Sequence, residues 1–158
     1  MPLPEEAQNY IECFSKFEYA LMESGYHKLD GECDACNRKG FLTSDWNTFK
    51  KNKLPTLTLQ DLKNISADTR YIIEQAPQKR IINDQGKPDW RDVSVSSVSD
   101  AIDACKRVRN NLVHGGKYND EKADRNRKLL KGATDIIRKL TEYDTNLKNC
   151  YDDAQFLS

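Results

Sequence analysis

Apolar side chains recur at three- and four-residue steps in several stretches of the chain, which is the spacing of one face of an α-helix. The first such stretch runs from Glu5 to Ser24, and Gly25 fits its C-terminal end. Its apolar stripe consists of Tyr10, Ile11, Phe14, Phe17 and Leu21. The pattern therefore predicts an amphipathic helix near the N-terminus.

Two stronger helices are predicted in the C-terminal part, from Ser96 to about His114 and from about Asp120 to Lys148. Their apolar stripes are Val98, Ala101, Ile102, Cys105, Val108 and Leu112 in the first, and Leu129, Leu130, Ala133, Ile136, Ile137, Leu140 and Leu147 in the second. Gly115 and Gly116 end the first helix, and the polar residues 119–121 cap the second. Because the connection is short, we expect the two helices to form an antiparallel pair.

The central part of the chain has a weaker pattern. Residues 26–42 are loop-like, and a short helix is predicted from Ser44, its N-cap, with Trp46 and Phe49 pointing inward. A further helix is predicted over 58–75.

Residues 76–92 contain two prolines and a glycine, so they predict an irregular connection with at most a small hairpin or turn. The chain has no internal repeat. We therefore expect an all-α fold, a bundle of four or five helices in a single domain over residues 1–158.

Composition agrees with one soluble domain. The chain has 158 residues, of which 37% are hydrophobic and 32% charged, which is polar but sufficient to close a core. No stretch approaches the roughly 18 apolar residues of a membrane span, and the first residues lack the basic and apolar regions of a secretion signal. We expect a cytoplasmic protein with no membrane partner.

The formal net charge of +0 conceals an uneven distribution. Residues 105–140 hold 11 basic and 4 acidic side chains, a net charge of +7, whereas residues 1–30 carry −4 and residues 141–158 carry −3. A local positive field can attract a polyanion even when the total is zero. A solvated helix face is the simpler interpretation of the charge alone.

Five cysteines, an odd number, do not indicate a disulfide framework in a chain with no secretion signal. Cys33 and Cys36 form a C-x-x-C pair, and with His27 and Cys13 they provide four potential zinc ligands. A structural zinc site usually pairs two such motifs, and the chain has one. We therefore expect surface thiols there, and we expect Cys105, on an apolar stripe, to fill the core.

The segment from Lys106 to Tyr118 carries the most promising chemistry. Histidine can transfer a proton near neutral pH, and arginine can hold a phosphate through two hydrogen bonds, so together they suit cleavage of an RNA phosphodiester without metal or cofactor. His114 would move the proton, an arginine would stabilise the transition state, and Asn110 or Asn111 would orient the phosphate or the imidazole.

Helical geometry leaves the choice of arginine open. At 100° per residue, Arg107, Asn110 and His114 share one face, whereas Arg109 lies about 140° from His114. Either Arg107 is the functional arginine, or the last turn departs from an ideal helix. A histidine at this position can also simply complement the helix dipole.

The residues from Arg109 to His114, Arg-Asn-Asn-Leu-Val-His, resemble the R-x(4–6)-H signature of HEPN domains, the higher eukaryotes and prokaryotes nucleotide-binding family. The resemblance extends over most of the chain and is weakest over residues 55–95. It also includes the segments Phe14 to Leu21, Gly25-Tyr26, Asp45-Trp46 and Val108 to Lys117.

The resemblance implies an all-α domain that dimerises, brings two motifs into one cleft and cuts RNA without metal, often as a toxin or an anti-phage defence effector. Arg109 and His114 match the signature residues, and Asn110 matches the polar residue after the arginine. Arg107, Asn111, Lys117 and Tyr118 are the expected RNA contacts.

An antitoxin or regulatory protein is a further expected partner. Residue 116 is glycine, and the tyrosine follows at 118, so the chain departs from the R-x4-H-x-Y form paired with nucleotidyltransferase antitoxins. Two other function classes stay open: a non-catalytic HEPN module that binds RNA or nucleotide or regulates a partner, and a helical interaction protein.

Overall fold

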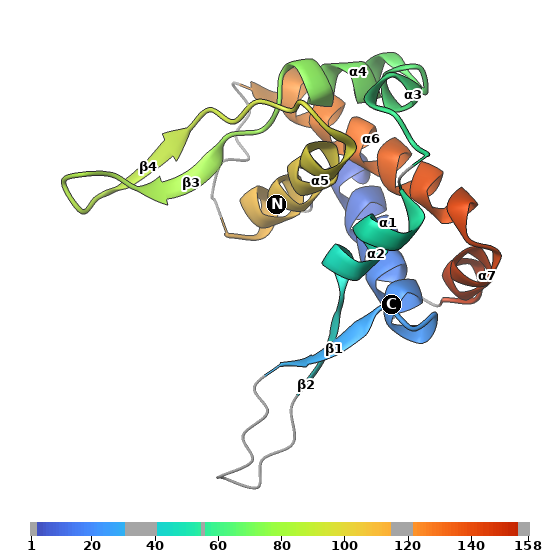
Figure 1. Cartoon of the computed structure of the whole chain (residues 1–158). Coiled ribbons are helices and arrows are strands. Elements are labelled where there is room, and N and C mark those ends of the chain that lie inside the picture. Colours follow the sequence, from blue (N-terminus) through green and yellow to red (C-terminus); the bar gives the residue numbers. More distant parts are fainter. Residues whose placement is uncertain (1–2, 31–40, 55, 115–121, 155–158) are drawn as a thin grey trace, which may run out of the picture. The chain divides into compact units, whose positions relative to one another are not determined.

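The structure is a computed structural model that describes residues 3–30, 41–54, 56–114 and 122–154 (Figure 1). Helices predominate among these residues. The helices are α1 (Glu5–Glu23), α2 (Trp46–Lys53), α3 (Leu59–Lys63), α4 (Ala67–Glu74), α5 (Val98–His114), α6 (Ala123–Leu140) and α7 (Thr145–Asp153), with a 3-10 turn η2 (Thr141–Tyr143). The strands are β1 (His27–Asp30), β2 (Phe41–Ser44), β3 (Lys79–Ile82) and β4 (Pro88–Arg91).

The chain divides into two compact units. The first contains residues 1–14 and 57–139, and the second contains residues 15–56 and 140–158. The first unit therefore holds α3 to α5, most of α6, the β3–β4 hairpin and the N-terminal part of α1. The candidate residues of the Arg-to-His stretch all belong to it.

An apolar core formed by α1, α5 and α6 holds the first unit together. The Tyr10 hydroxyl of α1 donates a hydrogen bond to the carbonyl oxygen of Cys105 in α5, and the Cys105 Sγ lies 4.0 Å from the carbonyl oxygen of Ala133 in α6. Farther along α5, Val108 and Leu112 share a cavity wall with residues of α6 that precede Ala133. The two helices therefore run antiparallel, as predicted.

The prediction of a single helix over residues 58–75 is wrong, because the structure contains two helices there, α3 and α4. Each begins with a capping box, Thr58 with Asp61 and Ser66 with Thr69. In each box the side chain of the N-cap residue accepts the backbone N–H of the residue three positions later. The side chain of that later residue in turn accepts the backbone N–H of the N-cap residue. Ser66 is extended, with φ of −160°, so the chain must leave the helix there to begin α4.

A close approach between α6 and α4 requires a glycine. A Cβ atom at Gly132 would lie 2.3 Å from the carbonyl oxygen of Asp68. Because Asp68 lies in the first turn of α4, the glycine allows the backbones of the two helices to meet.

Residues 76–92, predicted to be an irregular connection with at most a small hairpin or turn, contain the β3–β4 hairpin. Its strands are antiparallel, with Lys79 opposite Arg91, Arg80 opposite Trp90, Ile81 opposite Asp89 and Ile82 opposite Pro88. At the turn, the Asn83 side chain accepts the backbone N–H groups of Gln85 and Lys87 at 3.0 Å each. Gly86 takes a φ of +73°, which is costly for residues other than glycine.

An aromatic cluster forms the core of the second unit. Phe17 of α1 packs against Trp46 and Phe49 of α2, with ring centroids 5.1 and 5.7 Å away, so both α2 side chains are buried as predicted. The N-cap is Asp45, whose side chain accepts the N–H of Thr48, and not Ser44 as predicted. Ser44 instead donates its hydroxyl to Glu18.

Two further expectations for the second unit are wrong. Residues 27–30 and 41–44, within and beside the stretch expected to be a loop, pair as the β1–β2 hairpin. The helix predicted to continue to Lys148 ends at Leu140, and Asp144 begins α7 by accepting the N–H of Leu147. Asp144 has an extended backbone, with φ of −147°, which interrupts the helix.

The observed fold is thus mostly helical, with two small hairpins added to the expected helices. In the part of the chain that the structure describes, no helix has the length and apolar character that crossing a membrane requires.

Candidate functional site at the end of α5

Helix α5 carries the candidate residues, and its first turn is fixed by local polar contacts. Asp100 accepts hydrogen bonds from the backbone N–H and the hydroxyl of Ser96 at 3.1 and 3.0 Å, and its own N–H donates to Ser97. These bonds from Ser96 lower the pKa of the Asp100 carboxyl below its ordinary value of 3.8. The helix then continues to His114.

Arg107 is tied to the backbone that leads into the β3–β4 hairpin. Its Nε donates a hydrogen bond to the carbonyl oxygen of Pro77 at 3.2 Å, and the side chain is half-buried. Burial lowers the pKa of this guanidinium, while Asp103 raises it. One terminal nitrogen, Nη2, is buried without a hydrogen-bond partner among the described residues.

Asn111 repeats this contact one helical turn later. Its Nδ2 donates to the carbonyl oxygen of Gln78 at 3.0 Å. Residues four apart lie on the same helix face, so Arg107 and Asn111 together hold Pro77 and Gln78 against α5. Both residues were expected to contact RNA; the structure places them at the base of the hairpin.

Arg109 lies on a different side of the helix, about 200° around from Arg107. Its guanidinium carbon lies 5.8 Å from the centre of the Phe14 ring, and its Nη1 donates to the Asn110 side-chain oxygen at 3.3 Å. Within the described ranges, no carboxylate forms an ion pair with Arg109. The side chain is partly accessible and Asn110 is exposed, so both remain available to a ligand.

His114 is the last residue of α5. By helical register its backbone position lies on the side of Arg107 and Asn111. The other two expected RNA contacts, Lys117 and Tyr118, lie outside the residues that the structure describes, as do Gly115 and Gly116.

A cavity of about 50 Å³ lies between the end of α5, the start of α6 and the residues before β3. Its wall combines apolar side chains with amides and two cations. The lining residues are Pro77, Gln78, Val108, Asn111, Leu112, Lys122, Arg125, Asn126, Leu129 and Leu130. The Asn126 Nδ2 is buried and has no hydrogen-bond partner in the described structure. Its volume is sufficient for a few water molecules and is well below the roughly 300–1,000 Å³ of small-ligand pockets.

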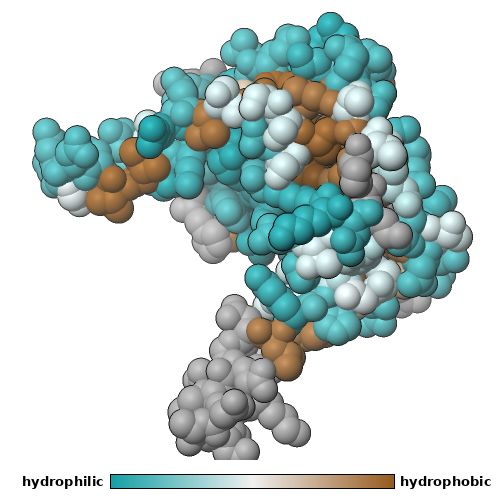
Figure 2. Space-filling view, viewed as in Figure 1, coloured by the Kyte–Doolittle hydropathy of each residue, from teal (hydrophilic) through white to brown (hydrophobic). Residues whose placement is uncertain are grey.

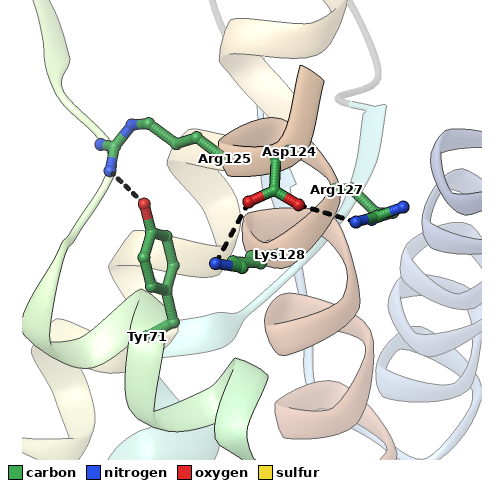
Figure 3. A network of polar contacts seen from close by, with 5 residues as sticks. All are labelled: Tyr71, Asp124, Arg125, Arg127 and Lys128. Carbon is green, nitrogen blue, oxygen red and sulfur yellow. Dashed lines mark hydrogen bonds and ion pairs between the residues drawn. The ribbon is translucent and has the colours of Figure 1, made fainter. Parts of the chain in front are cut away.

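Several cations of the basic block have structural contacts (Figure 3). Arg125 donates to the Tyr71 hydroxyl and to the carbonyl oxygens of Gln75 and Ala76, each at 3.3 Å, and so caps the end of α4. Arg127 and Lys128 form ion pairs with Asp124 at 2.7 and 3.2 Å. These exposed pairs are weak, so they leave part of the local positive field in place.

Cys105 has the structural role that was predicted, as a core residue. Cys105 is buried, and burial raises the pKa of its thiol, which keeps it protonated and unreactive. Cys33 and Cys36 lie outside the described residues. His27 is exposed, and its Nδ1 lies 3.0 Å from the carbonyl oxygen of Met22. Among the described residues, three or more potential metal ligands do not come together anywhere.

Three features of this region were missed by sequence reasoning. The apolar stripe that includes Phe14 gives no indication that this ring meets Arg109. Asn126 shows no pattern that marks it as a cavity residue, and the carbonyl groups of Pro77 and Gln78 have no sequence signature. Comparisons of the chain with family models, curated proteins and solved structures gave no match.

Proposed function

We propose that this chain is an endoribonuclease of the HEPN type, in which Arg109 and His114 cut RNA without a metal ion. The proposal rests on the Arg-Asn-Asn-Leu-Val-His stretch and on a mostly helical fold that carries it at the end of α5. An effector of anti-phage defence or a toxin is the biological role that the resemblance favours.

The placement of Arg109 is the observation that carries the proposal. Its guanidinium forms no ion pair with a described residue. It lies over the Phe14 ring and beside the Asn110 amide. An aromatic face under an arginine limits its motion while leaving N–H groups for a phosphate. Arg107, by contrast, uses its Nε on Pro77 and is half-buried. We therefore assign the catalytic role to Arg109 and a positioning role to Arg107.

The proposed reaction is an internal transesterification of RNA. The 2′-oxygen of a ribose attacks the adjacent phosphorus, and the bond from phosphorus to the 5′-oxygen of the next nucleotide breaks. His114 takes the proton of the 2′-hydroxyl or gives a proton to the departing 5′-oxygen. Arg109 stabilises the additional negative charge on the phosphate oxygens, and Asn110 orients the arginine. The products are a 2′,3′-cyclic phosphate and a 5′-hydroxyl.

A second copy of the chain would complete this site. Arg109 and His114 lie about 140° apart around an ideal helix, so one α5 does not present both on the same face. Two copies related by a two-fold axis can bring the arginine of one chain near the histidine of the other. The positions of Arg109 and His114 around α5 thus support the homodimer that the resemblance implies.

End-group analysis of cleaved RNA tests the proposal. Purified protein is incubated with a labelled single-stranded RNA in EDTA, and the product ends are identified by treatment with phosphatase and kinase. We expect 2′,3′-cyclic phosphate and 5′-hydroxyl ends. Ends with a 3′-hydroxyl and a 5′-phosphate would contradict the mechanism, and RNA that is bound but left intact would favour a non-catalytic module instead.

A further inference from the structure

The β3–β4 hairpin extends away from the helices of the first unit (Figure 1). Figure 2 shows hydrophobic atoms exposed on it between hydrophilic side chains. Ile82 is 67% exposed, far more than expected for an isoleucine that serves only the core. The proposed function gives this projecting element no role.

One face of the hairpin combines a cation with an aromatic ring. Side chains directly opposite in an antiparallel pair lie on the same face, and so do residues two apart in a strand. Arg80 and Trp90 are opposite each other, and the guanidinium carbon of Arg80 lies 4.8 Å from the centre of the Trp90 ring. Ile82 and Pro88, the next pair on this face, are exposed.

The other face sets two positive charges against each other. Lys79 and Arg91 are directly opposite in the register, and both are exposed. Like charges in opposite positions destabilise an antiparallel pair. Bound phosphate would relieve this repulsion.

Asp89 lies on the same face of the hairpin as Lys79 and Arg91, next to that pair in the register, and offsets part of its positive charge. Asp89 is opposite Ile81 and accepts the N–H of Trp90 at 2.8 Å. Asp92 accepts a hydrogen bond from the side chain of Gln78 at 2.9 Å. One face of the hairpin therefore presents Arg80 with Trp90, and the other presents Lys79 and Arg91 with Asp89 beside them.

We propose that the β3–β4 hairpin is an RNA-binding arm that holds single-stranded RNA next to the end of α5. A base stacks on the planar surface formed by Arg80 and Trp90, and the backbone phosphates contact Lys79 and Arg91. The choice of RNA over another polyanion rests on the proposed function.

The attachment of the hairpin explains how binding would serve the site. Arg107 and Asn111 hold the residues at the base of β3 through hydrogen bonds of 3.2 and 3.0 Å. A strand bound on the arm therefore lies on the side of α5 that carries Arg107 and Asn111, which by register is also the side of the His114 backbone position.

Fluorescence anisotropy with a labelled single-stranded RNA tests the inference. All variants carry His114→Ala in addition, so that the RNA stays intact whether or not the protein is a nuclease. Trp90→Ala removes the ring without changing the charge, and we expect affinity to fall about tenfold. Trp90→Tyr keeps an aromatic surface and should restore most of the binding. Arg70→Ala, which removes an exposed arginine of α4, is the control and should leave the affinity nearly unchanged.

Lys79→Glu separates an effect on RNA binding from an effect on folding. It places an opposite charge across from Arg91, so the hairpin should become no less stable and Tm should stay unchanged or rise. RNA affinity should nevertheless fall, and the slope of log K against log salt should decrease by about 0.7 for each phosphate that the variant no longer binds.

The outcomes distinguish this inference from the proposed function. Weaker binding by Trp90→Ala and Lys79→Glu supports the arm even if the wild type cuts no RNA. Wild-type affinity in both variants overturns the arm even if the wild type is an active nuclease. Equal loss of binding to heparin and to RNA in Trp90→Ala would also overturn it, because heparin has no bases to stack.

Discussion

The Nε of Arg107 donates a hydrogen bond to the carbonyl oxygen of Pro77 at 3.2 Å, and this bond joins α5 to the base of the β3–β4 hairpin. The next arginine in the chain, Arg109, lies on another side of the same helix, over Phe14. Two arginines only two residues apart thus have different surroundings. Under the proposed function this difference gives the first a positioning role and the second a catalytic role.

Arg107→Ala is expected to destabilise the fold by about 2 kcal/mol, because the variant lacks both a charge-assisted hydrogen bond and a half-buried side chain. Arg109→Ala, which removes the same charge, is expected to cost less than about 1 kcal/mol, since its contacts are an exposed amide and a ring. Urea denaturation of both variants measures the difference.

For RNA cleavage we expect the opposite order of effects from these two variants. Arg109→Ala should abolish RNA cleavage at a temperature where it is folded, whereas Arg107→Ala should retain cleavage with weaker RNA binding. A cleavage defect in Arg107→Ala as large as that in Arg109→Ala, with the protein fully folded, would reverse the assignment.

Gly132→Ala is expected to destabilise the protein by about 1–3 kcal/mol, because the new Cβ would lie 2.3 Å from a backbone oxygen that cannot easily move. Inside most helices the same change is stabilising by roughly 0.5–1 kcal/mol, so the sign itself is informative. Lys131→Ala, at the exposed neighbouring position, is the control for thermal denaturation. A higher Tm for Gly132→Ala would show that α4 and α6 are not in contact there.

Ser66→Ala is expected to cost about 1–2 kcal/mol of unfolding free energy, because the serine accepts the N–H of Thr69 and donates to Asp135 of α6 at 3.0 Å. Ser99→Ala, at an exposed position inside α5, is the matched control and should be neutral or slightly stabilising. Comparable Tm values for the two variants would argue against a separate α4 with its own cap.

Stability should depend on Asp100 at acidic pH. The bonds from Ser96 lower its pKa in the folded state below 3.8, so the unfolded chain takes up the proton first as pH falls. The stabilisation is complete above the unfolded pKa and is lost as pH falls through the folded pKa. The difference in unfolding free energy between wild type and Asp100→Asn should therefore shrink from neutral pH towards about pH 3. A constant difference would indicate that Asp100 does not titrate with folding.

The helices were predictable from sequence where an apolar stripe is long and continuous, as in α1, α5 and most of α6. The sequence also contains capping residues at the points where the predicted helices are interrupted. The apolar stripes continue across these points, so the interruptions were not predicted. Ser66 with Thr69 is a capping pair inside an otherwise helical pattern. Beyond Leu140 the next stripe residue is Leu147, and the polar stretch between them contains the cap Asp144. The strands β1 and β2 are too short to show an alternation that distinguishes them from a loop.

The candidate site was only partly predictable because its partners are distant in the sequence. The apolar stripe predicted the helix that carries the Arg-to-His stretch, but the sequence did not show which arginine is accessible. That depended on the carbonyl oxygen of Pro77 and on the ring of Phe14. A backbone carbonyl has the same chemistry at every position, so its role becomes visible only when the fold brings it to a side chain.

The rate of RNA cleavage in EDTA by His114→Ala measures whether this histidine is catalytic. The measurement compares wild type, His114→Ala, Arg109→Ala and the surface control Arg70→Ala, purified in parallel and assayed on the same single-stranded RNA. We predict that His114→Ala and Arg109→Ala lower the rate by about 10²–10⁴-fold and that Arg70→Ala leaves it unchanged. Cleavage by His114→Ala and Arg109→Ala at the wild-type rate would contradict this prediction.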